Sequence, residues 1–432
     1  MSVQDDAVHP RMVSGDLTGV EFPTGVDAFL AAGPAFLTTA LRATGALAAD
    51  NAVEEIVTWR EFFGGGMGRK LALDVRYTRP PEELSTALFA KFTREFGDPL
   101  REIFSPAMEP EVRFALLSRQ PGFPVRVPLC GFGDYSAGHK SGLLITERVA
   151  YGEGGIEPID DKCLDYRIAN PLERYQALTR SMAALAGHHC AGRFGAAIEA
   201  GFPYDPAAAL AQPLIPFDAA HLDGLLDKLE AFAAEAPQLL PATVRDPAFL
   251  AAFRPAAAMV LEKEQALRAF LYDQADMAAL CHWNMNLDNA WFWRDAAGTL
   301  QCGLLDWGGV GQMHLAMAFI GMTCAAECDF LKEHEDALID LLLAEYHKAS
   351  GLVLDRERFV LSLKVSIALV GLAWMLDAPS LIRAEIPDLS LLKDRFDPEI
   401  RDRFLPRAQL HLMTVFLDTW QRLDLGSAVA GI

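Results

Sequence analysis

The sequence predicts an α+β protein with a small β-rich amino-terminal part and a larger, mostly helical carboxy-terminal part. Three observations support this prediction. Alternating apolar residues mark the first third of the chain, apolar residues at helical spacing mark the remainder, and one short hairpin interrupts the helical part. With 432 residues, 51% of them hydrophobic, the chain is long enough for two parts that each bury a core.

The amino-terminal part is expected to follow a lead-in segment at 1–25 and to span residues 26–150. Its helices are predicted by apolar residues at i, i+3 and i+4, and its strands by alternation on either side of a glycine-rich turn. In chain order we expect a helix at 27–47, two strands within 52–77, a strand at 88–92, a helix at 111–120, and two closing segments at 125–135 and 142–149.

The carboxy-terminal part, residues 151–432, is expected to be helical apart from one hairpin. Long segments in this part carry the apolar stripe of a helix that packs one face on a core. The hairpin is predicted at 290–306, where the strand AWFW, a turn at 295–298 and the segment LQCGLLDW follow one another. We therefore expect two lobes of unequal size with a boundary near 151–155.

The charge and cysteine content of the chain indicate which binding partners and cellular compartments to expect. The chain has 38 Lys and Arg against 58 Asp and Glu, a net charge of −20, which repels a phosphate backbone, so we expect no nucleic-acid partner. We expect no secretory signal and no membrane span. Seven scattered cysteines are typical of free thiols in a reducing cytoplasm. Binding of ATP stays compatible with this charge, because ATP needs only a few local cations and a metal ion.

A glycine-rich turn is the first of four features that carry chemistry. The segment EFFGGGMGRK places Gly64, Gly66 and Gly68 between two predicted strands. Glycines at such a turn allow backbone N–H groups to approach phosphates closely. Taken alone, the pattern is more typical of an ordinary hairpin.

The second feature is Lys91, which lies among apolar neighbours on the predicted strand at 88–92. A buried ammonium group needs an anionic partner, and nucleotide phosphates together with a carboxylate would provide it. Glu111, at the start of the next predicted helix, is the natural candidate, and Glu102 and Glu109 are alternatives. Taken alone, a lysine on an edge strand with its ammonium in water is the simpler interpretation.

The third and fourth features are the segments CHWNMNLDNAWFW at 281–293 and GLLDWGG at 303–309. His282, Asn284 and Asn289 lie at intervals of two and five residues, an apolar strand follows them, and Asp306 follows a predicted tight hairpin. With these motifs the sequence resembles the aminoglycoside-phosphotransferase and choline-kinase superfamily. The resemblance covers roughly residues 25–425, and its specificity lies in the four features.

The resemblance implies a bilobal protein-kinase-like fold that binds ATP and Mg²⁺. Asn289 and Asp306 would bind Mg²⁺, a hard cation that prefers oxygen ligands. Lys91, braced by Glu111, would hold the phosphates under the turn at 64–68. Backbone groups from Glu147 to Val149 would hydrogen-bond the adenine base, a position that leaves ATP and GTP both open.

In the same resemblance, the loop that contains His282 and Asn284 would carry catalysis on a hydroxyl of a small-molecule acceptor. This sequence departs from the family at Asn284, where the family has an Asp that orients and deprotonates the hydroxyl. An amide cannot take up a proton at neutral pH, so general-base assistance of about 10²–10⁴-fold is lost, although the amide can still orient a hydroxyl. Asp288 is a weaker candidate for the base, because it directly precedes the predicted metal ligand.

We therefore expect an ATP-dependent phosphotransferase for a small alcohol. Acidic residues near the acceptor could favour a cationic substrate, although the overall charge does not locate them. The alternatives are a nucleotide-binding pseudokinase with a regulatory or scaffold role and an enzyme that transfers a nucleotidyl group. The sequence indicates neither the oligomeric state nor the acceptor.

Overall fold

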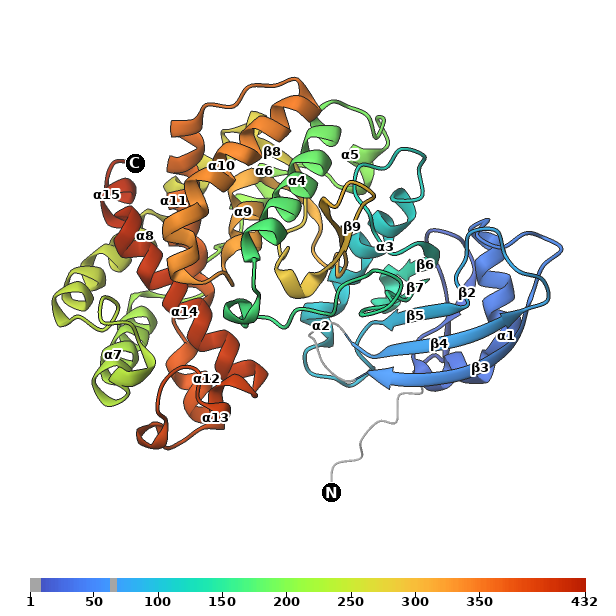
Figure 1. Ribbon diagram of the computed structural model, residues 1–432, viewed down its shortest axis with the longest axis horizontal. Helices are drawn as coiled ribbons and strands as arrows, with labels where there is room; N and C mark the ends of the chain where they lie inside the picture. Colours follow the sequence, from blue (N-terminus) through green and yellow to red (C-terminus); the bar gives the residue numbers. More distant parts are fainter. Residues whose placement is uncertain (1–8, 63–67) are drawn as a thin grey trace. The chain divides into compact units, whose positions relative to one another are not determined.

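The structure, a computed structural model, describes residues 9–62 and 68–432 (Figure 1). It divides into two compact units. The first comprises Met1–Glu157 together with Gly303–Val310, and the second comprises Pro158–Cys302 together with Gly311–Ile432. The first unit is built on a β-sheet and the second is mostly helical, which confirms the predicted α+β class with a small β-rich and a large helical part.

This division differs from the expected one in two respects. The boundary expected at residue 150 lies after Glu157, and the segment Gly303–Val310 belongs with the amino-terminal residues instead of the helical part. Local sequence patterns report on neighbours along the chain, so they gave no sign that this distant segment joins the first unit.

A five-stranded antiparallel sheet forms the centre of the first unit. In spatial order its strands are β3 (Val53–Phe62), β4 (Lys70–Tyr77), β5 (Ala87–Phe92), β7 (Ser141–Glu147) and β6 (Cys130–Ser136). The register places Lys70 and Leu144 opposite Lys91, on the strands at either side of it. Residues opposite each other in an antiparallel pair project from the same face, so these three side chains share one face of the sheet.

Helices cover the two faces of this sheet. On one face, α1 (Val26–Ala43) packs Phe29 into a core with Ile145. On the other face, α3 (Met108–Leu117), which follows the short α2 (Arg101–Phe104), packs Met108 against Leu144. Because Lys91 projects from the same face as Leu144, it points toward α3.

The expected lead-in at 1–25 contains ordered structure. β1 (Met12–Ser14) and β2 (Glu21–Pro23) form an antiparallel hairpin, and Phe22 is completely buried in the core of the first unit. The buried carboxylate of Asp134 accepts hydrogen bonds from the backbone N–H groups of Leu17 (3.0 Å) and Thr18 (2.9 Å). The segment is therefore part of the domain, although strands of three residues are too short to show a period in the sequence.

The second unit contains long helices joined by short elements and two strand pairs. Its helices are α4 (Pro171–Cys190), α5 (Ile198–Gly201), α6 (Pro206–Leu210), α7 (Ala219–Glu235), α8 (Pro247–Tyr272), α9 (Leu315–Thr323), α10 (Cys328–Ser350), α11 (Arg356–Trp374), α12 (Ala378–Glu385), α13 (Pro398–Arg401), α14 (Phe404–Leu423) and α15 (Leu425–Ala430). Its strands pair as β8 (Ala278–Cys281) with β11 (Gly311–His314) and β9 (Ala290–Arg294) with β10 (Leu300–Leu304).

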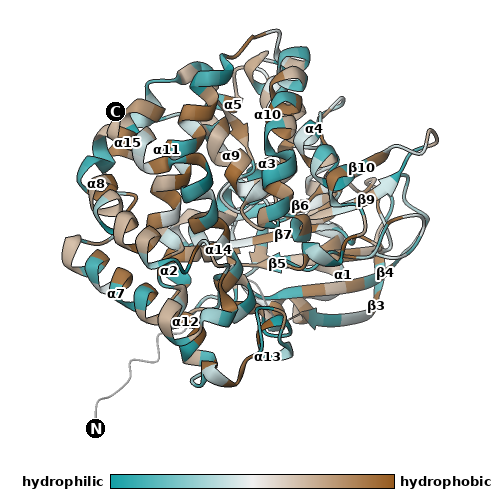
Figure 2. Cartoon of the chain, turned by 60° about the vertical axis from the view of Figure 1, so that its left-hand side comes forward, coloured by the Kyte–Doolittle hydropathy of each residue, from teal (hydrophilic) through white to brown (hydrophobic). Residues whose placement is uncertain are grey.

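The core of the second unit is formed mainly by α7, α8, α11 and α14. Hydrophilic and hydrophobic residues alternate along these helices, as expected for helices that bury one face (Figure 2). At the contact between α11 and α14, a Cβ atom at Gly371 would lie 2.0 Å from the Phe416 ring, so glycine permits the close approach of the two helices. This close contact holds α11 and α14 together in the core of the second unit.

One helical stretch, Arg356–Glu385, is long and apolar enough to cross a membrane by length and composition alone. In its most apolar window, 61% of the residues are buried inside the protein. Core helices of soluble proteins pass the same test, so the stretch is only weak evidence for a membrane span. All seven cysteines are free thiols, in agreement with the sequence prediction.

Candidate active site

Lys91 is the most constrained charged residue of the first unit. Its side chain is only 4% exposed, and its Nζ lies 2.8 Å from both carboxylate oxygens of Glu111 on α3 and 2.5 Å from Oδ1 of Asp306. Burial alone would lower the pKa of this ammonium group, but the two carboxylates outweigh burial and raise the pKa above its ordinary value. Lys91 is therefore a charged group inside the fold and not a surface lysine of an edge strand.

Of the three carboxylates considered as partners of Lys91, the structure selects Glu111. Glu102 forms an ion pair with Lys140 instead, and Glu109 lies 2.7 Å from Arg113 one helical turn later. The choice follows from geometry, because Lys91 projects from the sheet toward α3 and Glu111 lies on the buried side of that helix.

Asp306 is held in place by the residues around it in the segment Gly303–Val310. Trp307 stacks on Phe114 of α3 with ring centroids 3.8 Å apart, and its indole N–H donates to the carbonyl of Leu304 (3.1 Å). Phe114 follows Glu111 by one helical turn, so the same helix positions both carboxylates around Lys91. Asp306 has a left-handed backbone (φ 60°), and its side chain is 35% exposed, so the carboxylate is partly accessible to solvent.

The glycine-rich turn joins β3 and β4, as predicted. Gly64 and Gly66 lie outside the described residues, whereas Gly68 is described. A Cβ atom at Gly68 would lie 2.2 Å from the carbonyl oxygen of Phe92, and its φ of 140° is one that other residues rarely adopt. Gly68 therefore allows the end of the turn to lie directly on β5, close in sequence to Lys91.

The stretch expected to contact the base lies at the end of β7. The backbone N–H of Glu147 donates to the carbonyl of Leu129 (2.9 Å), and that of Arg148 donates to Ala87 (3.0 Å). In the part of the chain that the structure describes, the N–H of Val149 makes no hydrogen bond. The carbonyl of Glu147, which accepts from the Thr146 hydroxyl at 2.9 Å and keeps a second lone pair, and the N–H of Val149 are thus the groups that suit a base.

The predicted catalytic loop lies in the second unit, between β8 and β9. His282 is 1% exposed, and its Nδ1 accepts a hydrogen bond from the backbone N–H of Asn284 (3.1 Å). A buried imidazole that bonds the loop backbone cannot contact a substrate from solvent. His282 therefore bonds the backbone of the loop, and its grouping with the catalytic residues stays a prediction.

Asn284 and Asn289 are joined within this loop. The side-chain Nδ2 of Asn289 donates to the backbone carbonyl of Asn284 (2.9 Å), so the amide oxygen of Asn289 points away from that bond. The oxygen is the atom that a hard cation requires. This orientation is compatible with the predicted metal-ligand role of Asn289, which stays a prediction.

The amide oxygen of Asn284 is already engaged. It accepts from Nδ2 of Asn286 (2.5 Å) and from Nζ of Lys162 (3.3 Å). Two donors use both lone pairs of this oxygen, so the group left for an acceptor hydroxyl is the NH₂ of the amide, which donates. The predicted role of the amide in orienting a hydroxyl stays a prediction, with the NH₂ as the available group.

The sequence interpretation missed two lysines, Lys70 beside Lys91 in the first unit and Lys162 beside Asn284 in the second. Lys70 opens β4 directly after the glycine-rich turn and lies opposite Lys91; burial, and then the charge of Lys91, lower its pKa. The position of Lys70 next to the turn was a usable signal. Lys162 is far from Asn284 in the sequence and belongs to no motif, so its contact with Asn284 can be seen only in the structure. Among the described residues, no group of three or more His, Cys, Asp or Glu side chains is placed to hold a metal ion.

Comparisons with known proteins give matches among solved structures. The ethanolamine kinase of Plasmodium vivax is 8% identical, with 84% of this chain and 83% of that chain covered and a TM-score of 0.43. The choline kinase of Streptococcus pneumoniae is 12% identical, with 88% and 95% covered and a TM-score of 0.40. A microcompartment-associated aminopropanol kinase is 14% identical, with 90% and 98% covered and a TM-score of 0.42.

No protein-family model matches the chain, and the comparison with curated proteins gives no match. At such identities, and with TM-scores of 0.43 or less, the structural matches carry no argument about chemistry. The proposed function therefore rests on the geometry of the site.

Proposed function

We propose that the protein is an ATP-dependent phosphotransferase that transfers a phosphoryl group to a hydroxyl of a small molecule. The observation that carries the proposal is the buried Lys91 held between Glu111 and Asp306. A lysine that served only the core would need one carboxylate. The second carboxylate supplies an oxygen ligand of the kind that a divalent cation takes beside a phosphate-binding lysine.

Each nucleotide-binding role is assigned to a residue whose geometry fits it. Lys91 binds the phosphates while Glu111 keeps its ammonium in place, and Lys70 adds a second positive charge on the same face of the sheet. Asp306 and Asn289 offer the oxygen atoms for Mg²⁺. The ion, when bound, neutralises charge on the phosphate oxygens.

The acceptor is assigned to the loop around Asn284. The NH₂ of Asn284 donates to the acceptor oxygen and thereby orients it, and Lys162 supplies a positive charge beside it. The acceptor oxygen forms a bond to the γ-phosphorus as the bond between that phosphorus and the β–γ bridging oxygen breaks, and the acceptor proton passes to solvent. Because phosphoryl transfer has a loose transition state, positioning and charge stabilisation can support the reaction without a carboxylate base.

Nucleotide binding is tested by thermal unfolding with and without Mg·ATP. We expect Mg·ATP to raise the Tm of the wild type, since a ligand that binds only the native state stabilises it. Lys91→Met should abolish this rise. Lys140→Met, which removes a lysine paired at the surface with Glu102, should preserve it. A wild type that Mg·ATP does not stabilise would contradict the proposal.

A second candidate, a nucleotide-binding pseudokinase, is favoured by the engaged oxygen of Asn284. ADP release with a panel of alcohols separates the two, measured for the wild type and for Asn284→Asp. Turnover by the wild type supports the phosphotransferase, and we expect Asn284→Asp to increase it by up to about 10²-fold. Stabilisation by Mg·ATP with no turnover in either protein would leave the pseudokinase.

A further inference from the structure

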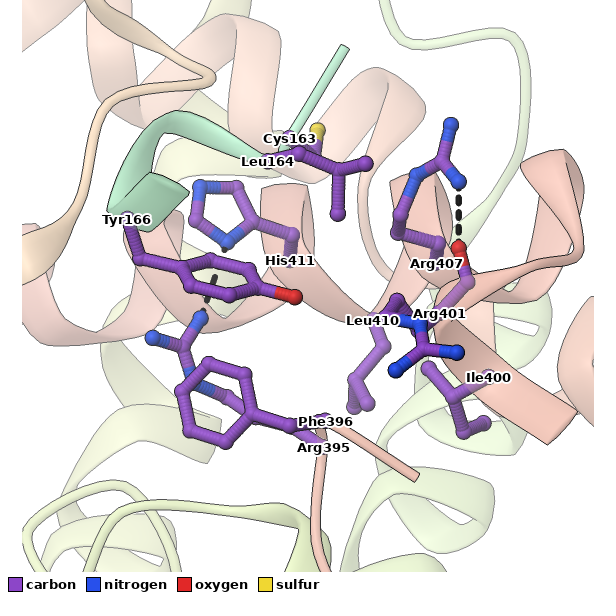
Figure 3. A pocket seen from close by; sticks show the side chains of 10 residues that line it. All are labelled: Cys163, Leu164, Tyr166, Arg395, Phe396, Ile400, Arg401, Arg407, Leu410 and His411. Carbon is purple, nitrogen blue, oxygen red and sulfur yellow. Dashed lines mark hydrogen bonds between the residues drawn. The ribbon is translucent and has the colours of Figure 1, made fainter. Parts of the chain in front are cut away.

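A shallow hollow lies in the second unit (Figure 3). It is lined by the segment that precedes α4 and by residues from 395 to 411, which include α13 and the start of α14. Its enclosed space of about 20 Å³ has room for about one water molecule, so a larger ligand would lie across its open side. The residues that line this hollow have no part in the nucleotide, metal or catalytic roles proposed above.

The wall of this hollow is positively charged. Its lining includes Arg395, Arg401 and Arg407 and contains no Asp or Glu, in a chain with a net charge of −20. Arg395 lies 2.5 Å from Glu327, and Arg401 forms a two-pronged pair with its neighbour Asp402. These carboxylates therefore balance two of the three guanidinium groups.

Arg407 is the guanidinium that has no such partner among the described residues. Its Nε and one terminal nitrogen donate to two backbone carbonyls, those of Lys162 (3.0 Å) and Arg401, and its charge helps to lower the pKa of Asp402. The other terminal nitrogen can donate to one oxygen of a carboxylate or phosphate group. The hollow thus carries a positive charge that an anion can neutralise.

An aromatic surface stands opposite Arg401 and Arg407. Figure 3 shows Tyr166 and Phe396 together with Arg395 on one side of the hollow. The two rings meet edge to face at 4.7 Å, and Arg395 lies over the Phe396 ring at 4.2 Å. Tyr166 is 39% and Phe396 41% exposed, so a flat apolar molecule can stack on them.

His411 makes this arrangement rigid. Its Nε2 lies 2.8 Å from the carbonyl oxygen of Ala325, so this nitrogen carries the proton and donates. Nδ1 then accepts from Arg395 at 3.3 Å. Burial lowers the pKa of His411, which keeps the ring neutral in this role. The position of Arg395 is therefore fixed before any ligand binds.

Lys162 connects the hollow to the catalytic loop. Its backbone carbonyl accepts from Arg407 at 3.0 Å, and its side-chain Nζ donates to Asn284 at 3.3 Å. Arg407 and Asn284 therefore contact opposite ends of the same residue, which places the hollow beside the catalytic loop.

We propose that this hollow binds the carboxylate or phosphate end of a small hydroxylated molecule, whose apolar body stacks on Tyr166 and Phe396. Resting on the proposed function, the acceptor of the phosphoryl group is then an acidic alcohol. This inference replaces the sequence-based expectation of a cationic substrate, because the lining carries arginines and no acidic residue.

The test compares three probes that share a phenyl body and a hydroxyl: 3-phenyllactate is an anion, 3-phenylpropane-1,2-diol is neutral and phenylalaninol is a cation. Binding to the full chain is measured by calorimetry without nucleotide. We expect 3-phenyllactate to bind at least 10-fold more tightly than either other probe. Equal affinities, or no detectable binding of the anion, would overturn the proposal.

Variants locate the binding site. Arg407→Gln should weaken 3-phenyllactate at least 10-fold, and Tyr166→Ala should weaken all three probes, which keeps the test valid if Arg407→Gln does not fold. Arg254→Gln, which removes an arginine from a surface ion-pair cluster on α8, should have no effect. Unchanged binding in both hollow variants would overturn the assignment.

The two proposals can fail separately. If 3-phenyllactate binds selectively and Arg407→Gln abolishes this binding, the proposed anion site in the hollow is supported, even if Mg·ATP does not stabilise the protein. Absence of stabilisation by Mg·ATP would contradict only the proposed phosphotransferase function. ADP release stimulated by 3-phenyllactate more than by the diol would support the acceptor role. Stimulation by the diol alone would overturn that role.

Discussion

At the scale of single residues, the candidate site depends on charges that are buried together. Lys91, Glu111 and Asp306 come from a strand, a helix and a distant loop segment, and all three meet at one Nζ atom. Removing one member of such a group leaves the others without the charge that balanced them. The Lys91–Glu111 pair should therefore affect stability as well as ligand binding.

We predict that Glu111→Gln lowers the free energy of unfolding by about 1–3 kcal/mol, because Gln keeps the volume but removes a buried charge next to Lys91. Urea unfolding at neutral pH measures the change. Glu102→Gln is the matched control. It breaks an exposed pair with Lys140, so its loss of stability should be clearly smaller. Equal decreases in the free energy of unfolding of the two variants would show that the buried Lys91–Glu111 pair stabilises the protein no more than an exposed pair does.

Part of this residue-scale arrangement was predictable from the sequence. Lys91 stood out as a lysine among apolar residues, and Glu111 lay on the helix that follows. Lys162 was not predictable, because its contact with Asn284 joins residues far apart in the chain that share no motif. The engagement of the Asn284 oxygen likewise depends on side-chain directions, which spacing along a chain does not determine.

At the scale of elements, the catalytic loop is fixed by a close approach of two backbones. A Cβ atom at Gly321 on α9 would lie 1.7 Å from the carbonyl oxygen of Trp283, the residue between His282 and Asn284. α9 is almost entirely buried, so it cannot move aside easily. The helix therefore supports the loop through a position where only glycine fits.

We predict that Gly321→Ala destabilises the protein by more than about 2 kcal/mol, because the new methyl group must displace either the loop or a buried helix. Thermal unfolding should show the loss as a lower Tm. Gly224→Ala on α7 is the control. No atom lies within 4 Å of its Cβ position, so helix propensity should make it stabilising by about 0.5–1 kcal/mol. A Gly321→Ala protein as stable as the wild type would contradict this account of the loop.

The elements themselves were largely predictable. Period-two alternation gave β3, β4 and β5, and the i, i+3, i+4 stripe gave α1, α3, α4 and α8, because each element buries one face. The β1–β2 hairpin was missed, since its strands are held by contacts with Asp134 and by burial of Phe22. The structural role of Gly321 was also missed. Its backbone conformation is ordinary, and glycine is needed only because the catalytic loop lies directly against it.

At the scale of the whole molecule, the second unit contains a group whose charge depends on pH near neutrality. Asp165 is 4% exposed, and burial raises its pKa to about 7, against the hydrogen bond that the Tyr175 hydroxyl donates to it at 2.5 Å. The negative charges of Glu327, Asp160 and Asp288 raise the pKa further. The native state therefore holds this proton more tightly than the unfolded chain does.

From this difference the direction of the pH dependence follows. A carboxyl group whose pKa is raised on folding adds stability at low pH, and that contribution is lost as pH rises from about 4 to about 7. Asp165→Asn removes the titration but keeps an acceptor for Tyr175, so relative to the wild type it should gain roughly 2–3 kcal/mol between pH 5 and pH 8. Urea unfolding of both proteins at the two pH values measures this gain. Asp329→Asn, whose side chain is 96% exposed, should show no such gain because its carboxylate stays in water. If Asp165→Asn keeps a constant offset from the wild type, its carboxyl group does not titrate near neutral pH.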